Sequence, residues 1–74
     1  MNITPDYTLI QAVEMLSDGA EVHQIAQELN IYVLAVRGLN ERPSEQDRLA
    51  YEVVRKTAEI KLRKFVVRKR LSRI

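Results

Sequence analysis

The stretch V-H-Q-I-A-Q-E-L-N-I-Y-V-L-A-V-R-G-L-N-E, residues 22–41, decides the fold that this sequence predicts. Its large apolar residues recur three or four positions apart, which is typical of helices. Asn30 interrupts the run, and Asn tolerates the left-handed backbone of a tight bend. Ala26 is small enough to stand where two helices cross. We therefore expect two short helices, over 21–29 and 32–40, that meet at a bend at Asn30.

This pattern resembles the helix-turn-helix of bacterial and phage DNA-binding proteins. The resemblance is carried by Ala26 at the crossing, by Asn30 at the place of the usual Gly, and by Val36 and Leu39 as anchors of the second helix. The preceding A-V-E-M-L-S-D-G extends the likeness over residues 12–41, toward the regulator and invertase type.

The resemblance implies that the second helix faces the major groove of double-stranded DNA. Arg37 would read a guanine edge or hold a phosphate, Tyr32 would donate to a phosphate, and Val33 would touch a thymine methyl group. Arg42, just beyond the helix, completes the DNA-binding residues expected in this part of the chain.

Outside this stretch, the sequence predicts one helix before it and one after it. Thr4-Pro5-Asp6 is typical of a helix start and Gly19 of a helix stop, which gives a helix over 5–18. After Pro43, Ser44 begins an unbroken helical pattern from Glu45 to Ile74. The expected protein is therefore all-α and a single domain over 1–74. It has a helix-turn-helix head (1–43) and a long amphipathic helix (44–74).

The long helix carries two apolar stripes, and a helix that is apolar on two sides has two surfaces to cover. One stripe consists of Tyr51, Val54, Ala58, Leu62 and Phe65. The other consists of Leu49, Val53, Ile60, Val67, Leu71 and Ile74. Spacing alone does not say which stripe faces inward. Because one molecule covers only one of them, we predict a homodimer, with the second stripe as its interface.

Charge is unevenly distributed along the chain. Residues 1–43 hold two basic and six acidic groups, a net charge of −4, whereas 44–74 hold ten basic and four acidic groups, a net charge of +6. This asymmetry favours an anionic partner for the C-terminal part, although a solvated charged helix also explains it. The basic residues expected to hold DNA phosphates are Lys61, Arg63, Lys64, Arg68, Lys69, Arg70 and Arg73.

Nothing in the sequence predicts catalysis. There is no Cys and only one His, His23, which the spacing puts on an outer helix face. We therefore expect no enzyme activity, no metal site and no cofactor. There is no secretory leader and no apolar run near 18 residues in length, so the expected location is cytoplasmic, without membrane contact.

Three functions remain open at this point. The first is a small dimeric DNA-binding regulator. The second is a protein-interaction module in which Tyr32, Val33 and Leu34 form an apolar patch for a protein partner. The third is an RNA-binding protein that uses the basic helix alone.

Overall fold

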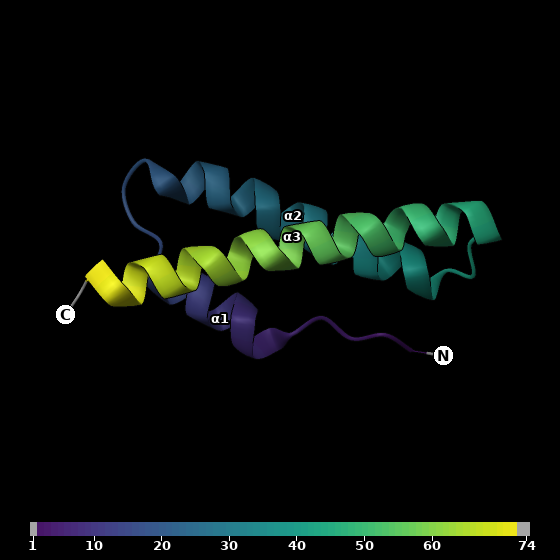
Figure 1. Cartoon of the computed structure of the whole chain (residues 1–74), viewed down its shortest axis with the longest axis horizontal. Coiled ribbons are helices and arrows are strands. Elements are labelled where there is room, and N and C mark those ends of the chain that lie inside the picture. Colours follow the sequence, from purple (N-terminus) through teal and green to yellow (C-terminus); the bar gives the residue numbers. More distant parts are fainter. Residues whose placement is uncertain (1, 73–74) are drawn as a thin grey trace.

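The structure, a computed structural model, describes residues 2–72, and this part of the chain forms three helices. They are α1 (Tyr7–Leu16), α2 (Glu21–Asn40) and α3 (Glu45–Ser72). Figure 1 shows that α2 and α3 form a long antiparallel hairpin and that α1 packs beside the C-terminal half of α3. The predicted all-α class is confirmed for the described residues, but there are three helices rather than four.

The first helix begins two residues later than the sequence predicted. Asp6, and not Thr4, caps it, because the Asp6 carboxylate accepts a hydrogen bond from the Leu9 N–H at 3.1 Å. This bond satisfies one of the free N–H groups at the helix start. Gly19 has a φ of 59° in the turn that follows α1, which is the conformation expected of a glycine at a helix stop.

The bend predicted at Asn30 is wrong, because α2 runs unbroken through this position. Asn30 lies exposed in mid-helix, where it costs less than about 1 kcal/mol relative to Ala. Against that small cost, a straight helix keeps one apolar stripe continuous on both sides of Asn30. Its members recur at steps of four and three residues: Ile25, Leu29, Tyr32, Val36 and Leu39. The packing of this stripe therefore overrides the local preference for a bend.

The third helix begins as predicted and covers almost the predicted range. The Ser44 hydroxyl accepts a hydrogen bond from the Asp47 N–H at 3.2 Å, as expected of an N-terminal cap. The helix extends to Ser72, the last described residue, and its 28 residues correspond to a length of about 42 Å. The whole molecule measures 44 × 21 × 14 Å, so α3 spans its longest dimension.

The core lies where α1 and α2 meet the inner side of α3. It consists of Leu9, Val13, Leu16, Tyr32, Val36, Ala58, Leu62, Phe65 and Val66. Tyr32 is buried among them, and its hydroxyl accepts a hydrogen bond from the Asp6 N–H at 2.9 Å. This bond satisfies the one polar atom that the tyrosine side chain brings into the interior.

Residues 2–6 lie along the C-terminal part of α2, where the side chain of Asn40 holds them by two hydrogen bonds. The Asn40 side chain accepts a hydrogen bond from the Ile3 N–H at 2.7 Å and donates one to the Ile3 carbonyl at 2.6 Å.

A close contact between α2 and α3 depends on glycine, because the ring of Tyr51 on α3 lies directly against Gly38 on α2. A Cβ atom at Gly38 would come within 2.6 Å of that ring, so glycine permits this close approach.

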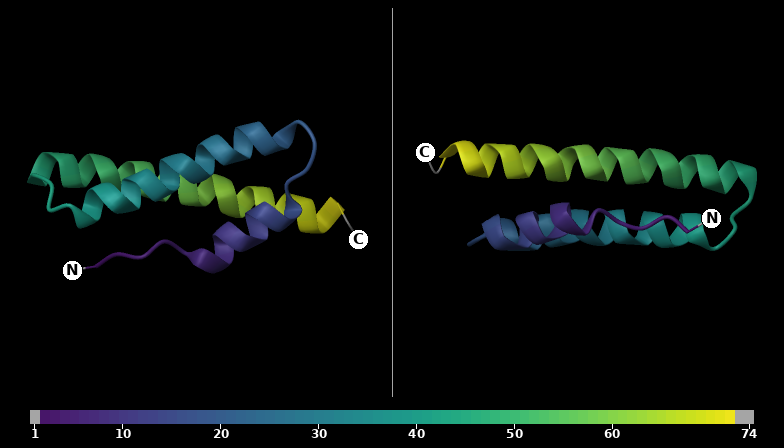
Figure 2. Two further views of the ribbon diagram at one scale, coloured as in Figure 1. Left: turned by 180° about the vertical axis from the view of Figure 1, so that it is seen from behind. Right: turned by 90° about the horizontal axis from the view of Figure 1, so that it is seen from below.

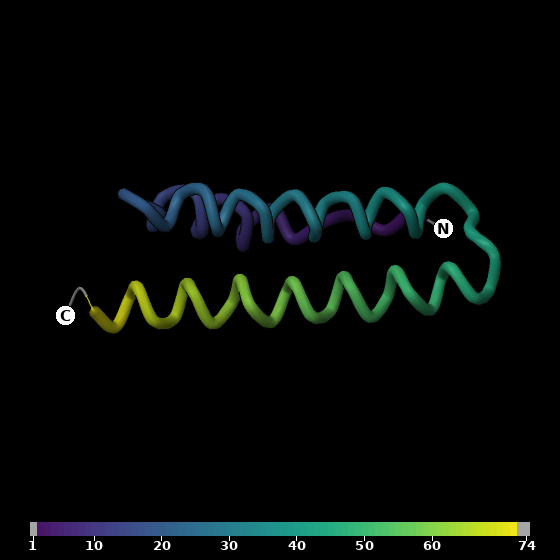
Figure 3. Tube along the Cα trace, turned by 90° about the horizontal axis from the view of Figure 1, so that it is seen from above, coloured from purple at the N-terminus to yellow at the C-terminus, as the bar shows by residue number. Residues whose placement is uncertain are grey.

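The three helices form only two layers. Figure 3 shows α1 and α2 together in one layer and α3 alone in the other. The right-hand view of Figure 2 shows the same division from the opposite side. No helix of the described part covers the far side of α3, which is therefore uncovered along its whole length.

Candidate interaction surface

The uncovered side of α3 carries the second apolar stripe that the sequence indicated. Its described members are 54–66% exposed, and we call them the outer stripe: Leu49, Val53, Ile60, Val67 and Leu71. Ile74 lies outside the described residues. The first stripe supplies the buried residues Ala58, Leu62 and Phe65, while Tyr51 and Val54 at its N-terminal end stay partly exposed. The structure thus decides which stripe faces the core.

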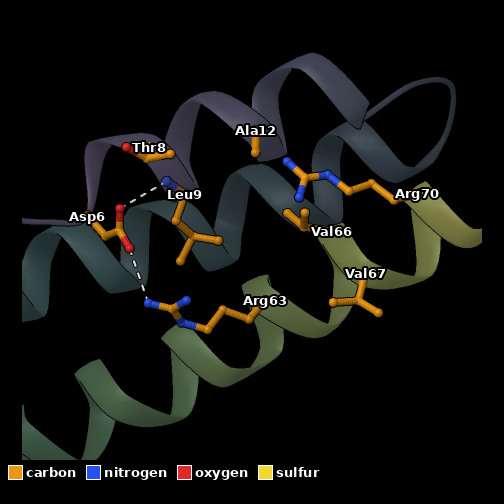
Figure 4. Close-up of a pocket in the computed structure, with 8 residues that line it drawn as sticks. All are labelled: Asp6, Thr8, Leu9, Ala12, Arg63, Val66, Val67 and Arg70. Carbon is orange, nitrogen blue, oxygen red and sulfur yellow. Dashed lines mark hydrogen bonds and ion pairs between the residues drawn. The ribbon is translucent and has the colours of Figure 1, made fainter.

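Two hollows border the outer stripe at its C-terminal end. The first lies on α3 itself and is lined by Arg63, Lys64, Val67, Arg68 and Leu71. The second is a groove of about 310 Å³ between α1 and α3, shown in Figure 4. Arg63 and Val67 line both hollows, so the two lie next to each other.

The groove is apolar at its base and charged at its rim. Leu9 and Ala12 of α1 face Val66 of α3 across it (Figure 4). At the rim, Arg63 donates to the Asp6 carboxylate at 3.1 Å, so the residue that caps α1 also ties this helix to α3. Arg70 reaches toward Ala12 from the other end of the groove (Figure 4).

Ion pairs between α3 and the acidic N-terminal half account for much of the charge asymmetry. Arg63 pairs with Asp6, Lys61 with Glu28 at 3.5 Å, Arg68 with Glu21 at 3.5 Å, and Lys69 with both Asp18 and Glu21. The negative head and the positive helix thus face one another within a single molecule. Four of the basic residues that we predicted to hold DNA phosphates already have carboxylate partners.

Two of these basic groups have perturbed pKa values. The hydrogen bond to Glu21 raises the pKa of Lys69 above its usual value, with support from the charge of Asp18. The hydrogen bond to Glu59 raises the pKa of Arg63 in the same direction. Both shifts mean that the charged form is stabilised by the protein's own carboxylates. Arg68 and Lys69 also lie over the ring of Phe65, at 5.7 and 5.9 Å from its centroid.

Three basic side chains beside the outer stripe make no ion pair within residues 2–72. They are Lys56, Lys64 and Arg70. All three are exposed and lie on α3, next to or between the apolar members of the stripe. The uncovered face is therefore apolar along its centre, with unpaired positive charges at its margins.

The residues expected to read DNA do not form one surface. Tyr32 is 2% exposed and belongs to the core, so its predicted phosphate contact is wrong. Val33 and Arg37 line a shallow hollow beside residues 2–7, and Arg42 lies in the loop between α2 and α3. That loop is at the opposite end of the molecule from the basic C-terminal end of α3 (Figure 1). Arg73 lies outside the described residues.

The apolar patch predicted for a protein partner is also divided. Tyr32 is in the core, Val33 faces the hollow beside residues 2–7, and Leu34 points outward and is exposed. Neighbouring residues of a helix do not share a face, and only residues three or four apart do so. Tyr32, Val33 and Leu34 therefore do not form one patch.

Sequence reasoning missed the ion pairs between the two halves of the chain. A signal for them was present, because acids at 18, 21 and 28 pair in reverse order with bases at 69, 68 and 61, as in an antiparallel hairpin.

Comparisons with known proteins found no relative of this chain. No protein-family model, no curated protein and no solved structure matches it. Within residues 2–72, no group of three or more His, Cys, Asp and Glu side chains is arranged to hold a metal ion. None of the described helices is both long enough and apolar enough to cross a membrane.

Proposed function

We propose that this protein is a dimerisation module that acts by protein–protein contact through the outer stripe of α3. The observation that carries the proposal is the exposure of five large apolar side chains along the uncovered face of a two-layer molecule. Large exposed apolar side chains gathered on one face typically mark an interaction site. A second copy of the chain is the partner that the sequence predicted, since it doubles the layers and buries the stripe on both sides.

The small size of the domain supports the same conclusion. A chain of 74 residues buries a smaller share of its surface than a larger domain does, so its own core is marginal. The four core residues that α3 supplies all lie on its inner side, while its outer side holds five large apolar residues that the single chain leaves exposed. Pairing through that side adds a second apolar layer and stabilises the folded chain by mass action.

A DNA-binding role remains a prediction, and the three unpaired cations are the feature that supports it. Neutralising phosphates with Lys56, Lys64 and Arg70 would give an affinity that falls as salt increases. Self-association through an apolar stripe between positive margins depends on salt in the opposite sense, because screening reduces the repulsion. The sign of the salt effect therefore distinguishes the two functions.

The experiment compares three chains by sedimentation velocity and circular dichroism. We expect the wild type to sediment as a dimer and Val53→Glu as a folded monomer, because dimerisation would bury two introduced carboxylates. Leu34→Glu is the matched control, since Leu34 is similarly exposed but lies on α2, and this variant should remain a dimer. A monomeric wild type, or a Val53→Glu chain that still dimerises, would overturn the proposal.

A second arm of the same experiment tests nucleic acid. Fluorescence anisotropy with a labelled DNA duplex is measured at low and high salt, for the wild type and for Lys64→Gln/Arg70→Gln. The proposal predicts no saturable binding at physiological salt. Saturable binding that weakens with salt and is lost in the double variant would favour DNA as the partner instead.

A further inference from the structure

We infer that residues 2–16 form one cooperative unit that opens from the α2–α3 hairpin, and that Asp6 is the residue that holds this unit closed. The unit consists of α1 and the extended segment of residues 2–6, which we call the strap. The inference does not depend on the proposed dimer, because α1 and α2 share the layer on the inner side of α3, opposite the uncovered side (Figure 3).

The strap lies on α2 as an extended peptide lies on a protein surface. Ile3 and Pro5 are partly buried, whereas Asn2 and Thr4 are exposed, which is the alternation expected of an extended chain. The Asn40 side chain bonds both the N–H and the carbonyl of Ile3, and the Ile3 side chain packs against the core. Ile3 therefore docks the strap through its side chain and its backbone together.

Asp6 connects the end of the strap to all three helices. Its N–H donates to the Tyr32 hydroxyl of α2 at 2.9 Å, and its two carboxylate oxygens accept from the Leu9 N–H of α1 and from Arg63 of α3, each at 3.1 Å (Figure 4). The cap makes Asp6 part of α1, so the bonds to Tyr32 and Arg63 hold α1 and the strap at the same point. Breaking these two bonds releases both.

The first helix depends on its contacts with the hairpin. It has 10 residues, fewer than the roughly 12–15 that an isolated helix needs to be stable in water. Among the described residues, none within Tyr7–Leu16 forms an ion pair. Its attachment rests mainly on the core residues Leu9, Val13 and Leu16, and on Asp6 just before it. We therefore expect α1 to lose its helical structure when it leaves the hairpin.

The α2–α3 hairpin keeps contacts of its own when residues 2–16 leave. Glu28 pairs with Lys61, and Glu21 pairs with both Arg68 and Lys69, so ion pairs join the two helices without α1. Supersecondary units of this kind often open and close as a whole, separately from the rest of a protein. Opening of residues 2–16 thus leaves a folded hairpin.

Opening begins at the strap end of the unit. The turn after α1 has a separate attachment, because Asp18 pairs with Lys69 of α3 at 3.5 Å. Movement of α1 about this turn uncovers Val66, which Leu9 and Ala12 face in the closed state (Figure 4). Apolar surface on the inner side of α3 is therefore accessible only in the open state.

Native-state hydrogen exchange, followed residue by residue with NMR, tests this inference on the full chain. In the wild type, we expect the protection factors of the amides of α1 to be at least about tenfold lower than those of the core amides of α2 and α3, because local opening costs less than global unfolding. Equal protection of all three helices would mean that the chain opens only as a whole, and the inference would fail.

Two substitutions of Asp6 test its role in holding the unit closed. Asp6→Ala removes both the cap and the tie to α3, and we expect it to lower protection in α1 by about a further tenfold, since a cap alone accounts for about fivefold. Asp6→Asn keeps a capping residue and should have a smaller effect. The hairpin should be little changed in either variant, and an equal loss of protection in all three helices would contradict the separate unit.

Asn40→Ala tests whether the strap and α1 open together. It removes both bonds to Ile3 and leaves the hydrogen bonds of α1 in place. If residues 2–16 are one unit, protection in α1 falls by about threefold or more, although the substitution is on α2. Unchanged protection in α1 would mean that the strap opens by itself, and would overturn the inference.

The matched control is Asn30→Ala, the same substitution on the same helix. Asn30 is exposed, and its side chain makes no hydrogen bond in the described part of the chain. This variant should leave the protection of α1 unchanged. A loss in α1 as large as that in Asn40→Ala would show that the strap is not the cause, and the inference would fail.

Discussion

Truncation of Ile60 to alanine is the most quantitative test of the proposed interface. Fully burying an isoleucine side chain is worth about 1.5–3 kcal/mol, and Ile60 is already about half buried in a single copy. Dimerisation therefore gains roughly 1 kcal/mol from Ile60 in each copy, and most of this is lost on truncation. Because both copies change at once, we expect a loss of about 1.5–2 kcal/mol, or roughly a 10- to 30-fold higher dissociation constant.

This variant leaves the single chain intact. Ile60 is 54% exposed and contributes little to the core, and alanine has the highest helix propensity. Sedimentation equilibrium at several concentrations gives the dissociation constant, and circular dichroism reports the helix content. Leu34→Ala is the control, because it removes a similarly exposed apolar side chain from α2. The reasoning is refuted if Ile60→Ala dimerises as tightly as the wild type, or if Leu34→Ala weakens the dimer as much.

Three further predictions concern the fold and its charges. Leu62 is fully buried between the helices, and Leu62→Ala should lower the free energy of unfolding by about 2–5 kcal/mol in urea titrations. The control, Val53→Ala, should change the free energy of unfolding little at concentrations where the chain is monomeric. Gly38→Ala should destabilise the wild type by displacing the Tyr51 ring but should stabilise a Tyr51→Ala chain by about 1 kcal/mol, so that a double-mutant cycle shows a change of sign. The hydrogen bond from Arg55 lowers the pKa of Glu52 from 4.5, so Glu52 stabilises the fold above pH 4.5 and loses this contribution as the pH falls through the lowered pKa. In a plot of the free energy of unfolding against pH, Glu52→Gln should therefore flatten the acid side. An unchanged plot would contradict this assignment.

The sequence predicted the helical class and the two-sided character of α3 because both depend on short-range periodicity. The Ser44 cap, the turn at Gly19 and the two stripes of α3 are properties of a few neighbouring residues. Each of them is found in the structure at or near its predicted place. Which stripe faces inward was not predictable, because that choice is made by α1 and α2 rather than by α3 itself.

The helix-turn-helix interpretation shows where local reasoning did not suffice. Asn30 is compatible with a bend, and the spacing around it fits two short helices, but it fits one long helix equally well. The outcome was decided by distant contacts, such as those that Tyr32 makes with Asp6 and with the core. Once α2 is straight, Tyr32 is buried, and the predicted groove-facing residues no longer form one surface.

The basic C-terminal segment shows a related difficulty. A run of positive charge predicts an anionic partner, yet part of that partner is the protein's own acidic N-terminal half. Sequence composition records the charges of both halves but not their pairing across the hairpin. Within the described part of α3, the cations left without an ion pair are Lys56, Lys64 and Arg70, and they could be identified only after α2 and α3 had been placed side by side.

The most direct test of the account is the molar mass of the unmodified chain, measured by sedimentation equilibrium over a range of concentrations and at two salt concentrations. We expect a mass of twice 8.6 kDa, with the dimer favoured further as salt increases. A mass of 8.6 kDa at every concentration up to about 1 mM would mean that any pairing is worth less than about 4 kcal/mol. The outer stripe would then not be an interface between copies of this chain.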